Sequence, residues 1–305
     1  MLTMMQNLLK TIADLPELNY GAYNLRANGK GVQQHSTDNI SITSKIGIPG
    51  IDIKVKPGAK GEVAYIPVVV TESGVNDMVF NAFEIGENAD VTIIAGCGIH
   101  NDGCNASQHD GIHRFHLCPG ARLKYVEKHY GEGEGTGDRI LNPTTIVQME
   151  EGSYCEMEMV QIGGVTSTMR KTDAHLGKDA KLVMTEKLLT HGSQTAHSDV
   201  TVNLDGEDAA LQIISRSVAK DTSVQVFHPI AIGNTKSRAH IQCDSIIMDD
   251  ARVSSIPEIT ANHALAQIVH EAAIGRINNE QLLKLQTFGL TEEEAETVIV
   301  NAFLD

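Results

Sequence analysis

The chain has 305 residues, of which 41% are hydrophobic, so it can bury one large core or two modest ones. Its formal net charge of -15 repels nucleic-acid phosphates, and no block of lysine or arginine interrupts that pattern, so we expect no nucleic-acid partner. Aromatic residues make up only 4% and tryptophan is absent, which argues against surfaces that stack rings on sugars or single-stranded bases.

The five cysteines form no paired framework of the kind that small secreted domains use. We therefore expect free or metal-bound thiols in a reducing compartment. The first fifteen residues have a short apolar stretch without a small-residue cleavage site, and nowhere do eighteen apolar residues run together. These features predict a cytoplasmic protein that does not associate with membranes.

The first predicted element is a short amphipathic helix over residues 2–15, which we expect to cap one end of the core. It belongs to a short helical or irregular segment over residues 1–45. The core is predicted to span residues 46–276, and a helical segment over residues 277–305 to follow it.

A short motif recurs through the predicted core: a glycine or polar residue, a small residue, a variable residue and then a strand-forming run. The small residues are Ala59, Ala89, Ala121, Ser153, Ala180, Ala209 and Ala251, at intervals of 30, 32, 32, 27, 29 and 42 residues. A unit of this length cannot bury its inner face alone, whereas stacked units bury a continuous core. The repeat therefore favours a β-solenoid over the alternative, a β-sandwich with irregular hairpins.

Alternation within one predicted strand assigns side chains to its two faces. In the segment 123–129, Leu123, Tyr125 and Glu127 face one way, and the lysines at 124 and 128 face the other.

The densest group of metal-capable residues comprises Cys97, His100, Cys104, His109, His113, His116 and Cys118. These residue types suit zinc or iron, but their spacing matches no zinc finger or ferredoxin. Strand alternation also sends His113 and His116 to opposite faces. We favour a histidine-rich loop and strand that satisfy their own hydrogen bonds. The alternative function is a β-helical carbohydrate-active or metal-dependent enzyme with a zinc site here.

Two further motifs carry little chemistry. The glycine-rich segment 131–139 lacks the Gly-Lys-Ser/Thr ending of a phosphate loop and contains three acidic residues, so we expect no directly bound nucleotide. The adjacent acids Asp249 and Asp250 could serve a carbohydrate-active enzyme or a metal, but such pairs at a turn are usually solvated.

A third candidate site combines Cys243 with His270 and Glu271. Cys243 and Glu271 lie 28 residues apart, close to one repeat, so stacking would bring them onto neighbouring strands about 5 Å apart. Thiolate, imidazole and carboxylate together could bind a soft metal or a cluster. In a strand, however, His270 and Glu271 point to opposite faces. Either a dimer shares the site, or only one of the two is a ligand, and Cys243 could equally be a buried small hydrophobe.

Two helices are predicted at the C-terminus. Asn278 can cap the first, which carries Leu282, Leu285 and Phe288 on one side and ends at Gly289. A Thr-x-x-Glu capping box at residue 291 begins the second, whose apolar stripe is Ala295, Val298, Ile299, Ala302 and Phe303. We expect this pair of helices to bind a partner.

At these residues the sequence resembles the SufB/SufD family, scaffold proteins of the SUF iron-sulfur cluster assembly system. The similar segments are YVEKH from Tyr125, SVAKDTSV from Ser217, IQCDS from Ile241, HEAA from His270, and NEQLLKL with GLTEEEA from Asn279 and Gly289. The resemblance covers most of the chain from about residue 85 and is strongest after Ser215.

The resemblance implies a right-handed parallel β-helix and a non-catalytic scaffold that pairs with itself or a paralogous subunit near the last turns. It implies a transient iron-sulfur cluster at that interface, with Cys243, His270 and Glu271 as ligands. It also implies a SufC-like ABC-type ATPase bound to the C-terminal helices, which would hydrolyse the ATP, and a sulfur donor. Two cysteines of SufB-type members are absent, one after Cys-Asp-Ser and one near His129.

Overall fold

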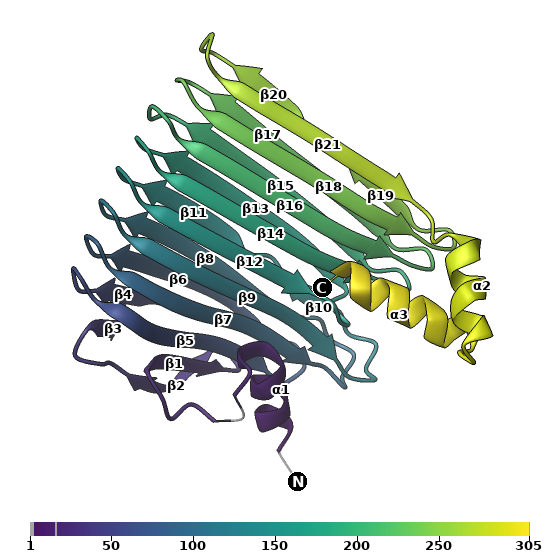
Figure 1. The fold of residues 1–305 in the computed structure, drawn as a ribbon. Helices are drawn as coiled ribbons and strands as arrows, with labels where there is room; N and C mark the ends of the chain where they lie inside the picture. The colour runs from purple at the N-terminus through teal and green to yellow at the C-terminus, as the bar shows by residue number, and fades with distance from the viewer. Residues whose placement is uncertain (1–2, 16, 305) are drawn as a thin grey trace.

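The computed structural model describes residues 3–15 and 17–304, which form a flattened β-solenoid of about eight turns with three helices. Each turn contributes one strand to each of two facing sheets (Figure 1). Neighbouring strands in both sheets are parallel, except for the pairs β1/β2 and β3/β4. The predicted solenoid is therefore confirmed, and none of the described helices is long and apolar enough to cross a bilayer.

Sheet A contains ten strands in the order β2-β1-β5-β7-β9-β12-β14-β16-β18-β21. They are β1 (Ala22–Ala27), β2 (Lys30–His35), β5 (Lys60–Val70), β7 (Asp90–His100), β9 (Arg122–Glu132), β12 (Tyr154–Gln161), β14 (Lys181–Thr190), β16 (Ala210–Ala219), β18 (Arg238–Ile247) and β21 (Gln267–Gly275).

Sheet B contains eleven strands in the order β19-β17-β15-β13-β10-β8-β6-β4-β3, with β11 and β20 beside this path. They are β3 (Ile40–Ser44), β4 (Ile51–Val55), β6 (Asn76–Ile85), β8 (Ser107–Leu117), β10 (Arg139–Leu141), β11 (Thr144–Met149), β13 (Ser167–Leu176), β15 (Thr195–Leu204), β17 (Val224–Gly233), β19 (Arg252–Ser255) and β20 (Glu258–Ala261).

The recurring sequence motif forms the corners that lead into sheet A, which we call the A corners. In six of them the residue before the small one has a left-handed backbone, a conformation that glycine, asparagine and aspartate adopt most readily. These residues are Gly58, Asn88, Gly120, Gly152, Asp179 and Asp208, with φ between 55° and 73°. The small residue that follows each is at most 7% exposed, because the next corner stacks directly on it.

The prediction that Ala251 continues the row of A corners is wrong. Ala251 lies at a corner that leads from sheet A into sheet B. At such corners the residue with the left-handed backbone stands two positions before the small one, as Asp249 does here. The A corner of that turn uses Ser237, 28 residues after Ala209, and its carbonyl accepts a hydrogen bond from the Gln267 N–H at 2.9 Å. The backbone of Lys236, the residue before Ser237, is not left-handed, so this position has no glycine, asparagine or aspartate to mark the corner in the sequence. This explains the anomalous interval of 42 residues.

The N-terminal helix α1 (Met4–Ala13) does not cap the column. It lies along the outer face of sheet A, against β5, β7 and β9 (Figure 1). Two glycines of β7 allow this contact, since a Cβ at Gly96 would lie 2.4 Å from the Ile12 carbonyl oxygen. Residues 22–44 instead supply β1, β2 and β3 at this end of the two sheets.

Alternation within the strands builds the core. In β14, for example, every second side chain is buried and the others are partly or fully exposed. Leu123, Tyr125 and Glu127 all face inward, as predicted, and one apolar cluster runs from Ala22 to Cys243 along the column.

The stacking of A corners predicts intolerance of larger side chains there. Ala180 is fully buried, so Ala180→Leu should overpack the corner and lower the free energy of unfolding by roughly 1–3 kcal/mol. Urea unfolding followed by circular dichroism would measure this. The exposed Ala106→Leu should change stability by less than about 0.5 kcal/mol, and equal midpoints for the two variants would contradict the expectation.

Candidate functional site

The last turn brings two of the three sequence-predicted ligands to the inner face of the solenoid. β21 pairs with β18 in a register that places Ala272 beside Cys243 and His270 beside Ile241. Ile241 and Cys243 are 0% and 3% exposed, so they face the core. His270 therefore points inward, on a position diagonal to Cys243.

In the described part of the chain the imidazole Nε2 of His270 is unpartnered, and the thiol of Cys243 interacts with the side chain of Ser255. Nε2 of His270 is buried and has no hydrogen-bond partner among the described residues, which is uncommon for a buried polar atom. Burial raises the pKa of the Cys243 thiol, so the sulfur carries its proton at neutral pH. An unpartnered imidazole nitrogen and a thiol are donors that suit iron or a cluster.

Glu271 lies on the other face of the same strand. Its register partner is Gln242, and its carboxylate is 3.6 Å from Nε2 of His240 on the outer surface. The side chain is 64% exposed. The structure thus separates Glu271 from His270, as strand alternation predicts.

The last turn is open at its end. β21 is the final strand of sheet A. In sheet B, β20 pairs with β17 beside the main path of strands and is exposed throughout. Large apolar side chains are exposed on this turn and the loops beside it, namely Ile256, Ile259, Leu265, Val269 and Ile274. Edge strands of this kind present unpaired backbone groups to another chain.

The C-terminal helices are α2 (Asn279–Thr287) and α3 (Glu292–Leu304), and the predicted caps at Asn278 and Thr291 are present. α3 lies back along sheet A, where Val300 and Leu304 pack against Val218 of β16 (Figure 1). The buried face overlaps the predicted stripe at Ala295 but is rotated towards Val300 and Leu304. Phe303 is partly buried against this cluster, and Val298 stays exposed.

The two C-terminal helices leave three large apolar side chains exposed, on α2, at its C-cap and on α3. It has no buried residue; Leu282 and Leu285 are half-buried, and Ile299 of α3 is likewise half-buried. Leu283, Phe288 and Val298 are 61%, 75% and 46% exposed, and we call these three residues the helix patch.

The Cys/His-rich segment does not form a metal site. Within the described part of the chain, no three or more His, Cys, Asp or Glu side chains are grouped to hold a metal ion. The histidines bond elsewhere: His100 to Glu132 and Asp102, His109 to Asp77, and His116 to Glu150. These hydrogen bonds agree with the interpretation of a histidine-rich loop and strand whose polar groups are already bonded.

The cysteines of this segment are equally dispersed. Cys97 is buried and faces inward, beside His129 in the register of β7 and β9. Cys104 is exposed and Cys118 is intermediate, and all five cysteines of the chain are free.

The paired acids are turn residues, as expected. Asp249 has a left-handed backbone, and its carboxylate accepts a hydrogen bond from the Asp221 N–H at 3.0 Å. Asp250 is exposed beside it.

The sequence analysis missed a buried polar cluster in the middle turns. It joins Tyr125, Glu127 and His129 of β9 to His113 of β8 and Arg170 of β13, all at most 5% exposed. Arg170 forms an ion pair with Glu127, and the Tyr125 hydroxyl donates to Glu127 at 3.1 Å. Nδ1 of His113 lies 2.9 Å from that hydroxyl oxygen. The cluster is a continuous hydrogen-bonded chain inside an apolar column.

Burial and the ion pair set the charges in this cluster. Burial alone would raise the pKa of Glu127, but the Arg170 guanidinium outweighs it and holds that pKa well below its usual range. Burial lowers the pKa of both His113 and His129 to about 4. At neutral pH Arg170 thus pairs with Glu127, its Nε lies 3.6 Å from the carboxylate of Glu186, and both imidazoles are neutral.

A sequence signal existed for only part of this cluster. Alternation already placed Glu127 on the face of Leu123 and Tyr125, so its burial could have been deduced. Its partner Arg170 lies 43 residues away in a different sheet, and no local pattern connects the two.

The fold and the candidate site together define a parallel β-solenoid with an open last turn that presents a thiol and an imidazole. A family profile described as "SUF system FeS cluster assembly, SufBD core domain" matches residues 70–303, and the chain belongs to this SufBD family of iron-sulfur cluster assembly. The resemblance seen in the sequence is confirmed.

Curated relatives agree with this assignment. An iron-sulfur cluster assembly SufBD family protein of Archaeoglobus fulgidus is 26% identical over 261 residues, covering 85% of this chain and 69% of the relative. One from Methanothermobacter thermautotrophicus is 26% identical over 261 residues, covering 84% and 62%. One from Methanocaldococcus jannaschii is 27% identical over 237 residues, covering 77% and 74%. The chain thus matches between 62% and 74% of the length of these relatives.

The buried ion pair predicts a double-mutant signature. Arg170→Met leaves the Glu127 carboxylate buried without its partner, so the free energy of unfolding should fall by roughly 3–5 kcal/mol. Arg170→Met combined with Glu127→Leu removes both charges of this pair and should recover part of that loss, because Glu186, 3.6 Å from Arg170, still loses its partner. Urea unfolding would compare the variants.

A matched control is Lys124→Met, which removes an exposed ion pair with Glu156 and should cost at most about 1 kcal/mol. A double variant no more stable than Arg170→Met alone would show that the pair is not what limits stability.

Proposed function

We propose that this chain is a non-catalytic, cytoplasmic scaffold on which an iron-sulfur cluster is assembled as cargo. The observation that carries the proposal is that the last two sheet-A strands of a SufBD-family solenoid place an unpartnered imidazole and a protonated thiol at diagonal positions of the inner face. Two copies, or one copy and a paralogous subunit, would pair at this end.

The need for a second chain follows from the donor count. Within one chain only Cys243 and His270 share the inner face, and Glu271 projects from the outer one. Pairing through the β21 edge would bring two such half-sites together and cover the exposed apolar side chains of the last turn. Glu271 of each copy would then reach the cluster from the outer surface. The sulfide would come from an external sulfur donor.

The partner proposed for the helix patch is a SufC-like ABC-type ATPase. Leu283, Phe288 and Val298 expose apolar area on helices that already pack internally through Val300 and Leu304. Val300 and Leu304 anchor α3, and α2 packs against α3, so the patch is an exposed apolar surface available to another protein. ATP hydrolysis would be carried out by that partner and would act on the pairing of the last turns.

A carbohydrate-active or zinc-dependent enzyme is the weaker candidate. The acids proposed for it are turn residues, and the Cys/His-rich segment offers no grouped metal ligands in the described residues.

Anaerobic reconstitution with ferrous iron and sulfide tests the half-site. The wild-type chain should develop charge-transfer absorbance with about one cluster per two chains, and Cys243→Ser or His270→Ala should lose most of it. Because the thiol must release its proton to bind metal, loading should weaken as the pH falls.

Cys104→Ser is the matched control, since this thiol is exposed and lies outside the last turn. Unchanged absorbance in Cys243→Ser, or equal losses in Cys104→Ser, would remove the support for this site.

Co-expression with a SufC-like ATPase tests the helix patch. Phe288→Asp and Val298→Asp each place a charge in the proposed contact and should reduce co-purified ATPase at least tenfold. The control Ile46→Asp alters a fully exposed apolar residue in the loop before β4 and should retain the ATPase. If both patch variants retain the partner while circular dichroism matches the wild type, the ATPase docks elsewhere.

A further inference from the structure

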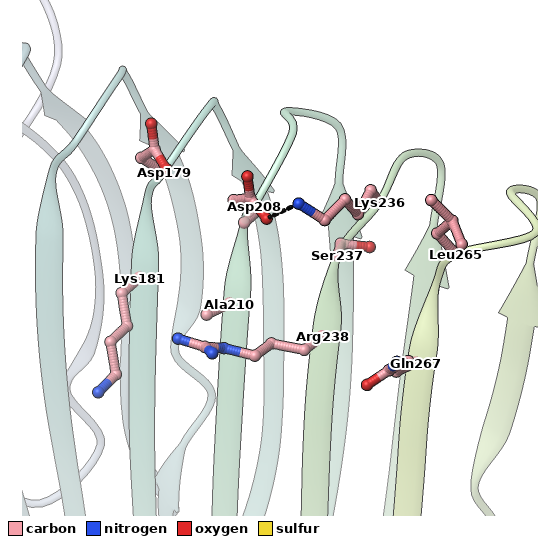
Figure 2. A pocket seen from close by; sticks show the side chains of 10 residues that line it. Asp179, Lys181, Asp208, Ala210, Lys236, Ser237, Arg238, Leu265 and Gln267 are labelled. Atoms are coloured by element: carbon pink, nitrogen blue, oxygen red, sulfur yellow. Dashed lines mark ion pairs between the residues drawn. The ribbon is translucent and has the colours of Figure 1, made fainter.

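A hollow of about 430 Å³ lies on the outer face of sheet A, next to the A corners of β14, β16 and β18 (Figure 2). Its floor is Ala210, which faces outward yet is only 6% exposed. The register places Lys181 on one neighbouring strand and Arg238 on the other. The hollow exists because the small Ala210 side chain lies between the long side chains of Lys181 and Arg238.

The charges around this hollow do not balance. Each aspartate at its rim already has a lysine: Asp208 pairs with Lys236 at 2.9 Å, and Asp179 lies 3.7 Å from Lys178. Figure 2 shows the Arg238 side chain crossing the strand of Ala210 towards the strand of Lys181, without an ion pair to any residue drawn.

Lys181 is similarly without a carboxylate within ion-pair distance among the residues that Figure 2 shows. Its ammonium group points away from Arg238 and lies 5.8 Å from the centroid of the Tyr154 ring. The strands that carry the two cations are about 10 Å apart, so the like charges repel each other across the hollow. In a chain of net charge -15, this site has two cationic side chains, Lys181 and Arg238, without an ion-pair partner among the described residues, although Lys178 near Asp179 is shared with Glu151 at 2.6 Å.

We propose that this hollow binds a phosphate dianion, either free or on a small phosphate monoester. The Arg238 guanidinium presents paired N–H donors that match phosphate oxygens, and the Lys181 ammonium turns inward once an anion offsets the repulsion. Gln267, next to Arg238 in the same register row, supplies a third donor. Two cationic side chains without ion pairs match a dianion better than they match a single carboxylate.

The apolar edge of the hollow bears on whether the ligand is free phosphate or a phosphate monoester. Leu265 is 58% exposed at the edge of the hollow and offers an apolar contact for the organic part of a monoester. A free phosphate would leave this side chain without a role. The two cations of the site lie on β14 and β18, away from the proposed cluster ligands and the helix patch, whereas Leu265 and Gln267 belong to the last turn, through which the chains are proposed to pair.

Isothermal titration calorimetry of the full chain, with inorganic phosphate and with glycerol 3-phosphate at low salt, tests the proposal. Saturable binding is expected, and Arg238→Gln and Lys181→Met should each weaken it at least tenfold. Ala210→Gln fills the floor without altering charge and should weaken it similarly. Arg252→Gln removes an exposed arginine at the start of β19 in the other sheet, and binding should be unchanged.

Each outcome decides the matter. Tighter binding of glycerol 3-phosphate, lost in Leu265→Ser, assigns the site to a monoester, and equal affinities assign it to free phosphate. Absence of saturable binding at millimolar concentrations overturns the proposal. So do equal losses in Arg252→Gln and Arg238→Gln, which would indicate nonspecific attraction. Binding of hexaglutamate that depends on Arg238, without binding of either phosphate, would overturn it in favour of an acidic protein segment.

Discussion

The structure depends on one recurring corner. In it, a residue with a left-handed backbone precedes a small buried residue, whose carbonyl accepts a hydrogen bond from the backbone of the next turn. Because the small side chain occupies little space, the backbone N–H of the following turn reaches that carbonyl at 2.7 to 3.0 Å, as between Arg122 and Ala89 or Arg238 and Ala209. This contact keeps successive strands in register over 27 to 32 residues. Every site described above is positioned by that register.

Polar groups inside the column behave differently in the middle and at the end. In the middle turns Glu127 and Arg170 neutralise each other, and Tyr125 and His113 complete their hydrogen bonds. At the last turn there is no further strand to supply partners, so Nε2 of His270 remains unsatisfied. Inward polar side chains of the middle turns therefore stabilise the fold, whereas an inward polar side chain of the last turn, His270, is free to bind a ligand.

Much of this arrangement could be predicted from the sequence, because its signals are local. Small residues spaced by about 30 positions indicate the solenoid, and alternation in the segment after Val269 places His270 and Glu271 on opposite faces. The packing of the helices cannot be predicted in this way, because it depends on which surfaces of the folded sheets can accept a helix. α1 packs on the flank because Gly96 allows close approach, and α3 uses Val300 and Leu304 because Val218 lies opposite them. Likewise, the partner of Glu127 could not be deduced, since Arg170 belongs to the opposite sheet.

The spacing of paired strands also bears on how the chain is made. Each turn needs only the turn before it, about 30 residues upstream, as a surface on which to form, so the column can grow in the direction of synthesis. Cys243, His270 and the C-terminal helices belong to the final turns. A truncated or misfolded column would consequently lack both surfaces, and only a chain whose earlier turns have already stacked can present them to other proteins.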